Sequence, residues 1–522
     1  MSNRDALTSP YGIGGRVAPS RVVFGPHETN LCAGRAISPR SVAYYERRAR
    51  GGAGIVVAES ASVHPSDWPY ERAPLATECG PGWRDTVAAC RPHDTLVLAG
   101  LTHTGSQGSS AYSRRELWAP SRVADPGSRE LPKEMETADI AAVVDGFACA
   151  AEVAIAADVD GVEIDAGASG LLRQFHSGLT NRRTDGYGTD RLRLTREVLT
   201  AVRAVLGPER IVALRLSCDE LAPWAGITPE IAAGHASTLG EFVDLLTVVR
   251  GGSLDPSGYR PDAHGPEGFN TDLCRQIHDR IAGRAAVVLQ GSLIDPAQAQ
   301  RAIDGGVAEL VEMTRAQIAD PDLVRTWRSG RSPRPCVLCN QACLVRDVRN
   351  PIVTCIGNPD AGYESRTAEG TAGPPRRALV VGGGPAGLEA ARVLATRGHR
   401  VTLRERETKL GGMTRRAAVG ESRRRLAHLT DWLEDECRRL GVAIEVGTEV
   451  RSADIDATEA IILATGSMAA PPRYPIGADV RYFTAPEVLS GNAILDGPVL
   501  LDDPVGGPVA VALAELLAAR GF

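Results

Sequence analysis

Short runs of aliphatic and β-branched residues alternate with longer amphipathic stretches over the first 330 residues. Stretches with helical periodicity, such as 137–157 and 195–206, separate the runs. Repeated β-then-α alternation requires parallel strands, so we predict an α/β fold. Eight such units in about 310 residues favour a (β/α)8 TIM barrel, with a doubly wound sheet as the alternative. The predicted strands are 21–26, 53–60, 95–103, 160–166, 211–217, 244–251, 285–291 and 308–314.

The loops after the last two predicted strands are candidates for phosphate binding. In a barrel the site lies at the C-terminal strand ends, and these two loops often hold a phosphate group. Gly291 and Ser292 begin the first loop, and Thr314 and Arg315 begin the second. Backbone N–H groups of small residues and a guanidinium fork both suit phosphate oxygens. A plain turn beside a surface arginine is the alternative.

Four of the 11 cysteines are crowded into one stretch, as Cys336-x2-Cys339-x3-Cys343-x11-Cys355. Four closely spaced thiolates in one loop can hold a [4Fe–4S] cluster. A structural zinc ion is the main competitor, although zinc ribbons usually pair two C-x2-C steps. A disulfide framework is not expected, because the chain is long and carries an odd number of cysteines without an export signal.

A linker rich in Gly, Pro and charge is predicted over 356–377, and a dinucleotide-binding fingerprint follows it. An apolar strand leads into Gly-x-Gly-x-x-Gly, a helix follows, and a second strand ends in an acid. The glycines allow a tight turn and close approach of a pyrophosphate, and the acid accepts the ribose hydroxyls. The predicted nucleotide-binding residues are Gly382, Gly384, Pro385, Ala386, Gly387, Glu405 and Gly412.

Residues 497–522 look like the start of a second nucleotide-binding unit. A predicted strand leads to Gly506 and Gly507, and a helix follows. The next strand of such a unit is missing. We therefore expect either a truncated chain or an incomplete NAD(P)H site.

Composition narrows the class of protein. Hydrophobic residues make up 43% and charged residues 23% of the 522 residues, and the net charge is −6. These values suit a globular protein and give no sign of a nucleic-acid footprint. The N-terminus has no apolar signal region, and no uncharged apolar run reaches the length of a membrane span. We expect a cytoplasmic protein with no membrane contact.

Several stretches resemble the flavin-dependent Old Yellow Enzyme family, among them YYERRARGGAGIVVAES, HTGSQG, VALRLS and TRAQIADPDL. The resemblance is closer to the long branch of 2,4-dienoyl-CoA reductase and of trimethylamine and histamine dehydrogenases, which share the cysteine spacing. The stretch RVVFGPHETNL is also similar to members associated with mycofactocin gene clusters. The resemblance covers Pro10 to Phe522.

The resemblance implies FMN in the barrel and, from GGGPAG and the later LGG, FAD in the unit that carries the glycine fingerprint. It places Arg215 beside flavin N1, where a fixed guanidinium stabilises the negative charge of the reduced ring. A strand-end salt bridge is the alternative for Arg215. The other residues that it places along or near the flavin are Gly25, Pro26, Thr29, Glu59 and His103.

The substrate side departs from the family pattern. The residues that grip a substrate carbonyl in the family are replaced by Asp165, Ala168 and Ser169, and an ionised aspartate cannot donate a hydrogen bond. Glu28 stands where amine dehydrogenases attach flavin through a cysteine, so a covalent flavin is not expected. The proton donor cannot be carried over from the family. The candidates for acid–base work are His27, Asp165, His176, Tyr259 and His264, with His103 as a further one.

The domain prediction is a catalytic FMN barrel over 1–330, a cluster segment and linker over 331–375, an FAD-binding Rossmann-like domain over 376–490 and a partial NAD(P) unit over 491–522. The first functional hypothesis is an oxidoreductase that passes electrons from NAD(P)H through FAD, [4Fe–4S] and FMN to an activated C=C bond of a small molecule. The second is an amine or alcohol dehydrogenase that passes electrons to a carrier protein. The third is a redox-inactive or sensing relative. The sequence leaves open the substrate, the nicotinamide site and a homo-oligomer.

Overall fold

The computed structural model divides the chain into two compact units, Met1–Thr367 and Ala368–Phe522. The first unit therefore contains both the predicted barrel and the cysteine stretch. The residues that the structure describes are 5–252, 255–345, 350–366, 373–420, 423–454, 460–472 and 474–522.

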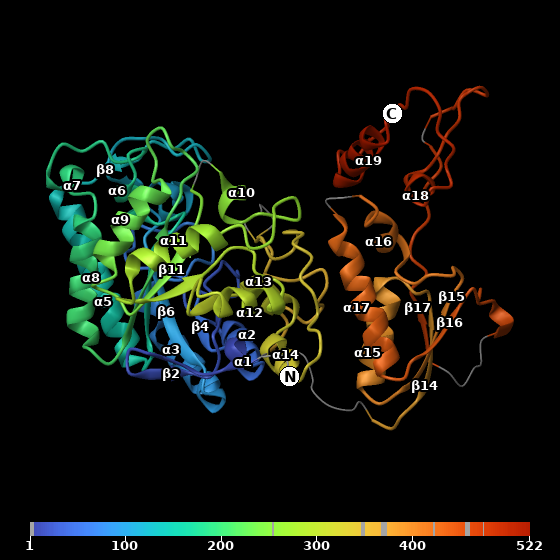
Figure 1. Ribbon diagram of the computed structural model, residues 1–522, viewed down its shortest axis with the longest axis horizontal. Coiled ribbons are helices and arrows are strands. Elements are labelled where there is room, and N and C mark those ends of the chain that lie inside the picture. Colours follow the sequence, from blue (N-terminus) through green and yellow to red (C-terminus); the bar gives the residue numbers. More distant parts are fainter. Residues whose placement is uncertain are drawn as a thin grey trace. The chain divides into compact units, whose positions relative to one another are not determined.

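Eight parallel strands of the first unit close into a barrel (Figure 1). β3 pairs with both β4 and β13, and β4 pairs with β6, which closes the ring. Every strand lies within one of the eight predicted runs, so the barrel prediction is confirmed and the doubly wound alternative is wrong. The barrel strands are β3 (Val22–Phe24), β4 (Ile55–Val57), β6 (Leu96–Thr102), β9 (Gly161–Ala166), β10 (Ile211–Ser217), β11 (Leu245–Val249), β12 (Ala286–Leu289) and β13 (Leu310–Glu312).

Helices cover the outside of the barrel (Figure 1). Helix α8 shows why they form there: Leu194, Val198 and Val202 recur at helical spacing and are all buried. Side-chain caps fix several starts, as where Ser38 accepts two backbone N–H bonds at the start of α2. The outer helices are α2 (Pro39–Arg50), α3 (Ala76–Cys90), α5 (Thr137–Ala156), α8 (Arg193–Leu206), α9 (Pro229–Leu239), α11 (Thr271–Ile281), α12 (Pro296–Asp304), α13 (Thr314–Ala319) and α14 (Leu323–Arg328).

Shorter elements complete the unit. The hairpin of β1 (Tyr11–Ile13) and β2 (Arg16–Ala18) contributes Ile13 and Ala18 to a buried cluster with barrel-strand residues. The other short strands and helices are β5 (Ala61–Ser62), β7 (Trp118–Ala119), β8 (Lys133–Glu134), α1 (Asp5–Thr8), α4 (Ser110–Ser113), α6 (Leu171–His176), α7 (Gly186–Thr189) and α10 (Pro256–Tyr259).

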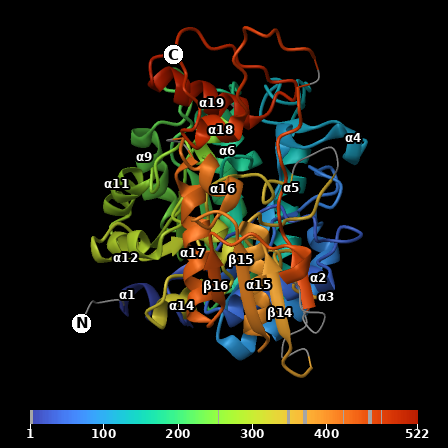
Figure 2. The same cartoon turned by 90° about the vertical axis from the view of Figure 1, so that its right-hand side faces the viewer.

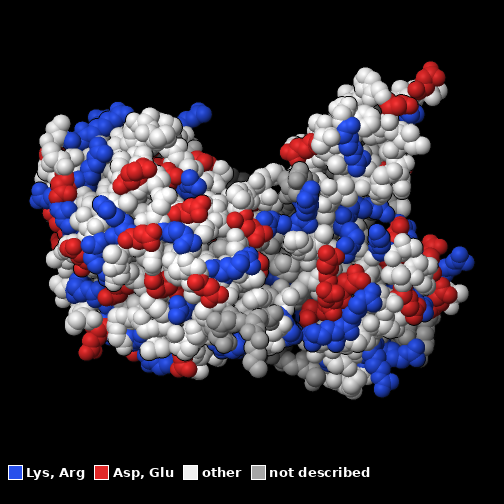
Figure 3. Space-filling view, viewed as in Figure 1, with Lys and Arg blue, Asp and Glu red and all other residues white. Residues whose placement is uncertain are grey.

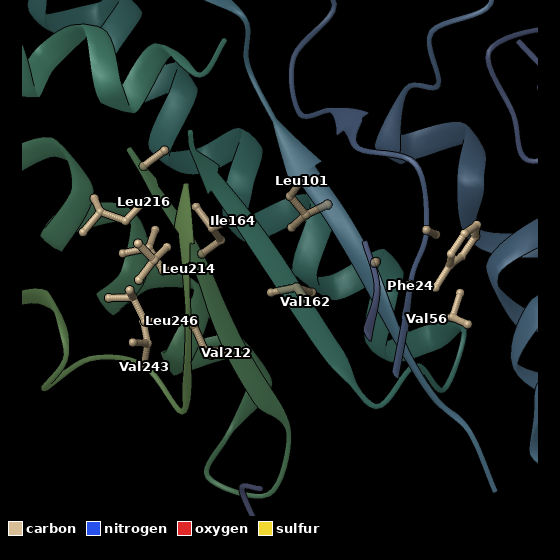
Figure 4. Close-up of a cluster of buried hydrophobic side chains, with 14 of the residues drawn as sticks. Phe24, Val56, Leu101, Val162, Ile164, Val212, Leu214, Leu216, Val243 and Leu246 are labelled. Atoms are coloured by element: carbon tan, nitrogen blue, oxygen red, sulfur yellow. The ribbon is translucent and has the colours of Figure 1, made fainter. Parts of the chain in front are cut away.

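The core has two layers, because successive side chains of a strand point to opposite faces. Ile55 and Val57 belong to one buried cluster, while Val56 between them belongs to the cluster formed with the outer helices. Figure 4 shows part of that second cluster, with Val162 and Ile164 on one strand and Val212 and Leu214 on the next. Burial on both faces explains why the strands read as continuous apolar runs.

The second unit holds a four-stranded parallel sheet in the order β16-β15-β14-β17. Helices α15 and α17 pack together beside this sheet (Figures 1 and 2). This confirms the predicted Rossmann-like domain. Its elements are β14 (Arg377–Val381), α15 (Pro385–Thr396), β15 (Arg400–Glu405), α16 (Gly412–Ala417), α17 (Arg425–Arg439), β16 (Ala443–Val446), β17 (Ala460–Leu463), α18 (Ala485–Leu489) and α19 (Pro508–Ala519).

Two stretches differ from the expectation. The start of the predicted linker packs on the barrel: Arg40 donates to Gly362 O at 2.9 Å, and Arg48 pairs with buried Glu364. Residues 367–372 of that linker lie outside the described residues. Helix α19 forms as predicted, but residues 498–502 before it are not a strand, because no neighbouring strand pairs with them in the described part of the unit.

Charges of both signs are interspersed over the surface seen in Figure 3, as expected from the small net charge. Within the described ranges, every helix is too short or too polar to cross a bilayer.

Candidate active site

A pocket opens at the C-terminal ends of the barrel strands. It encloses about 1280 Å³ of empty space when its open mouth is included. Each of the eight strands, or the loop that follows it, contributes a wall residue. Ten predicted site residues line this pocket: Pro26, His27, Glu59, Asp165, Arg215, Tyr259, Gly291, Ser292, Thr314 and Arg315.

Arg215 is held between two carboxylates inside the barrel. Its Nε donates to Glu163 at 2.9 Å and its Nη2 donates to Glu312 at 2.5 Å. Burial lowers the pKa of Arg215, but the two carboxylates outweigh burial, so the net pKa is raised and the guanidinium stays charged. Gly25 donates its N–H to Thr314 at 2.9 Å, and a Cβ on Gly25 would overlap the Glu312 carboxylate. A fixed cation therefore faces the pocket, where the negative charge of a reduced flavin would be stabilised.

The loop after β12 and the start of α13 carry donors suited to a phosphate. Arg315 donates to Ser292 Oγ at 2.6 Å, and both residues line the pocket. Gly291 has a φ of +136°, and a Cβ there would press on Asn270, so the turn requires glycine. The residues present fit FMN, with Arg315 and the turn at Gly291 and Ser292 at the phosphate and Arg215 at the ring.

The Glu59 carboxyl accepts several hydrogen bonds at the pocket wall. One carboxyl oxygen accepts the Thr29 N–H at 2.9 Å and the Tyr70 hydroxyl at 2.5 Å, and the other accepts the Thr29 hydroxyl at 2.5 Å. Burial raises the pKa of Glu59 to about 7, against the lowering effect of these bonds. Thr29 does not line the pocket; it supports Glu59 from behind.

His27 and His103 have both ring nitrogens engaged. His27 contacts Gly25 O at 3.0 Å and the Tyr44 hydroxyl at 2.9 Å. Burial lowers its pKa to about 3. His103 accepts the Gly105 N–H at 3.0 Å and contacts Ser66 at 3.1 Å, and it stands behind the pocket wall. Neither ring has a free nitrogen to exchange a proton with a substrate.

The structure places the other acid–base candidates differently. Asp165 and Tyr259 reach the pocket, but Asp165 already accepts bonds from Thr102 at 3.0 Å and from the Gly167 N–H at 2.8 Å. His176 is buried outside the pocket, where it bonds Thr195 at 2.7 Å. His264 is exposed and pairs with Asp262, also outside the pocket.

The cysteine stretch is attached to the barrel by hydrogen bonds. Arg315 donates to the Asn340 side chain at 2.8 Å, and Asn340 donates to Arg260 O at 2.9 Å. Arg260 in turn donates to Cys343 O at 2.7 Å, and Val353 donates to Thr29 O at 2.8 Å. Pocket wall and cysteine stretch are therefore neighbours within one unit.

The four thiols share one neighbourhood. Burial raises the pKa of Cys336 to about 12; Arg315 and the Leu338 N–H oppose this, and the Cys355 and Cys343 thiols add to it. The Leu338 N–H points at Cys336 Sγ at 3.5 Å. All four are free thiols. In the part of the chain that the structure describes, no group of three or more His, Cys, Asp or Glu side chains is arranged to hold a metal ion. Thiols in one loop with backbone N–H groups aimed at sulfur fit an iron–sulfur cluster.

The glycine fingerprint of the second unit has the geometry of a dinucleotide cradle. Gly382 has a φ of +107°, and a Cβ at Gly382 or Gly387 would overlap backbone oxygens. Gly384 faces open space at the start of α15, where a pyrophosphate can approach. Glu405 accepts the Gly383 N–H at 2.6 Å at the end of β15. The residues present fit a dinucleotide.

Residues 7–333 match the profile of the NADH:flavin oxidoreductase / NADH oxidase family, which covers more than half of the chain. The chain belongs to this family. It is an enzyme of the Old Yellow Enzyme type, as the sequence resemblance predicted. Residues 380–436 match the NAD(P)-binding Rossmann-like domain. Together these matches support FMN in the barrel of this flavin oxidoreductase and a dinucleotide in its second unit.

Known proteins resemble this flavin oxidoreductase over nearly its whole length. A "Metal reductase" of Desulforamulus reducens is 31% identical over 99% of this chain and 78% of its own length. An "N,N-dimethylglycine/sarcosine dehydrogenase" of Chromohalobacter salexigens is 32% identical with the same coverage. A solved structure of 2-naphthoyl-CoA reductase with 2-naphthoyl-CoA has a TM-score of 0.92 at 25% identity, covering 99% of this chain and 82% of that one.

Several wall residues of this flavin oxidoreductase were missed in the sequence. Glu312 could have been predicted from the sequence, because it is an acid two residues before Thr314 in an otherwise apolar strand. Arg260 adjoins the predicted Tyr259. Tyr70 belongs to no motif, so nothing in the sequence marked it as a site residue.

Proposed function

We propose that this enzyme is a flavin and iron–sulfur oxidoreductase whose barrel pocket reduces an activated C=C bond of a small molecule. The observation that carries the proposal is Arg215, a cation fixed by two carboxylates on the wall of the pocket at the C-terminal ends of the barrel strands. FMN bound there supplies hydride chemistry. The reductase named among the similar structures supports this direction.

The other cofactors are part of the same proposal. Cys336, Cys339, Cys343 and Cys355 hold a [4Fe–4S] cluster, which supplies one-electron transfer. The second unit binds FAD, with Glu405 at the ribose and Gly384 at the pyrophosphate. NAD(P)H is the proposed donor of electrons.

A second function, amine oxidation with an external electron carrier, has one observation in its favour. Asp165 and Glu59 both stand on the pocket wall, and carboxylates suit a cationic amine. A dehydrogenase of N-methylated amino acids is among the similar proteins.

Two anaerobic half-reactions separate these functions. Reduced holoenzyme is mixed with a panel of enones and cinnamoyl compounds, and oxidised holoenzyme is mixed with N-methylated amines. We expect at least one alkene of the first panel to reoxidise the reduced flavin. We expect none of the amines to bleach the absorbance of the oxidised flavin. Bleaching by an amine without reoxidation by any alkene would favour the dehydrogenase.

A further inference from the structure

Glu59 and Tyr70 form a hydroxyl–carboxyl pair on the pocket wall. Glu59 follows β4 and Tyr70 lies on the loop after β5, and both line the pocket. The Tyr70 hydroxyl lies 2.5 Å from the Glu59 carboxyl, which is only 1% exposed. In the described part of the chain, no Arg, Lys or His forms an ion pair with Glu59. The pair therefore holds a carboxyl near the reaction space with no neutralising cation.

The surroundings of Glu59 leave its proton exchangeable near neutral pH. Burial raises its pKa to about 7, and the nearby Glu28 adds to the rise. Burial also raises the pKa of the thiols and phenols around it, which keeps them neutral. The groups that face Glu59 are Glu28 and Cys32 from the loop after β3, Tyr44 and Tyr45 from α2, Tyr70, and Cys79 from α3.

The direction of the Tyr70 hydroxyl depends on the state of Glu59. A hydroxyl carries one proton. When Glu59 is ionised, Tyr70 donates that proton to the carboxylate. When Glu59 is protonated, the acid can donate to the Tyr70 oxygen instead, and the Tyr70 proton is released to point into the pocket. Thr29 is the weaker route, because it lies behind the wall and its oxygen already accepts the Leu31 N–H at 3.0 Å.

We propose that Tyr70 gives the substrate the proton that C=C reduction requires and that Glu59 resupplies it. This rests on the proposed function. The alkene gains a hydride from the reduced flavin at one carbon and the Tyr70 proton at the other, so one π bond breaks and two C–H bonds form. Tyr70 then takes the Glu59 proton, and the carboxylate regains a proton from water. The pair thereby fills the role left open where the family's donors are replaced.

The rival donors are weaker on geometry. His27 and His103 have no free ring nitrogen, and His176 and His264 lie outside the pocket. Tyr259 lines the pocket but is 40% exposed, and no hydrogen bond to an acid is recorded for it among the described residues. Tyr259→Phe therefore serves as the comparison variant.

The test follows reoxidation of the dithionite-reduced holoenzyme by cinnamaldehyde in anaerobic stopped flow between pH 5.5 and about 9, a range that brackets Glu59. The wild-type rate constant is expected to fall as pH rises through about 7, because the active form has Glu59 protonated. Tyr70→Phe and Glu59→Gln are expected to slow reoxidation roughly 10²–10⁴-fold, and Glu59→Gln to lose the pH dependence. FMN affinity, measured separately, is expected to stay within a few-fold.

Tyr187→Phe is the matched control. Its hydroxyl also donates to a carboxylate, Glu197 at 2.9 Å, but away from the pocket, and its rate is expected to equal that of the wild type. Wild-type speed in Tyr70→Phe, or a large loss in Tyr259→Phe alone, would overturn the proposal.

An infrared titration of the Glu59 carboxyl tests the Glu59–Tyr70 relay even if the enzyme does not reduce cinnamaldehyde. If the wild-type enzyme reduces no alkene, the proposed C=C reduction is contradicted, and the infrared titration still tests proton exchange between Glu59 and Tyr70. The resting holoenzyme is then expected to show a protonated carboxyl band that disappears through about pH 7, is absent in Glu59→Gln and shifts in Tyr70→Phe. A band that does not titrate between pH 6 and about 8 would overturn the relay.

Discussion

The Arg315 guanidinium donates a 2.8 Å hydrogen bond to Asn340, which directly follows Cys339. Its other terminal nitrogen donates to Ser292 on the pocket wall at 2.6 Å. One side chain therefore joins the predicted phosphate site to the predicted cluster segment. The two sites are built on one unit, which suits electron exchange between them.

Replacing Arg315 tests its phosphate role. Arg315→Met removes the charged donors while keeping an unbranched side chain, and FMN affinity is expected to fall roughly 10–100-fold, the effect of losing hydrogen bonds to a charged group. Fluorescence titration of the flavin-free protein with FMN measures it. Arg325→Met is the control, because Arg325 is 60% exposed and pairs with Asp322 on the surface. Equal affinity in both variants would contradict the assignment.

The cysteine stretch is expected to lose its iron when one thiol is removed. Cys355→Ala deletes one of four proposed ligands, and iron and sulfide are expected to fall from about four each per chain toward zero. Cys149→Ala removes an exposed thiol elsewhere and is expected to leave both unchanged. Iron that stays at the wild-type level in Cys355→Ala would show that this thiol is not a ligand.

Arg215 is expected to matter for stability as well as for flavin chemistry. Arg215→Met leaves Glu163 and Glu312 buried without their cation, which is expected to lower the free energy of unfolding by about 3–5 kcal/mol. The triple variant Arg215→Met, Glu163→Gln, Glu312→Gln is expected to recover most of the loss. Urea unfolding followed by tryptophan fluorescence measures both, since Trp83 and Trp118 are buried in the barrel unit. A single variant as stable as the wild type would contradict the charge argument.

Glu59 is expected to make stability fall as pH rises. Its pKa rises from 4.5 to about 7 on folding, so the native state binds more protons than the unfolded state between these values. Stability is therefore highest below about pH 4.5 as far as this group is concerned, and about 3 kcal/mol is lost by pH 7. Glu59→Gln is expected to lack this drop when unfolding is measured at pH 5 and about 7.5. An unchanged difference between the two pH values would contradict the shifted pKa.

The barrel could be predicted because each strand is buried on both faces and therefore consists of consecutive apolar residues. Arg315 could be placed because the C-terminal strand ends of a barrel meet at one mouth, and the family resemblance placed Arg215 beside the flavin. The partners could not be predicted: Glu312 is 97 residues from Arg215, and Tyr70 reaches Glu59 through a loop without a motif. His176 shows the opposite error, because the sequence made it an acid–base candidate, yet on α6 it bonds Thr195 away from the pocket.

Cofactor analysis of the anaerobically purified protein is the sharpest test of the proposed flavin and iron–sulfur content. We predict FMN and FAD together with about four iron atoms and four sulfides per chain, and a visible spectrum that contains both flavin and cluster absorption. Zinc in place of iron, or a barrel that retains no flavin, would contradict it.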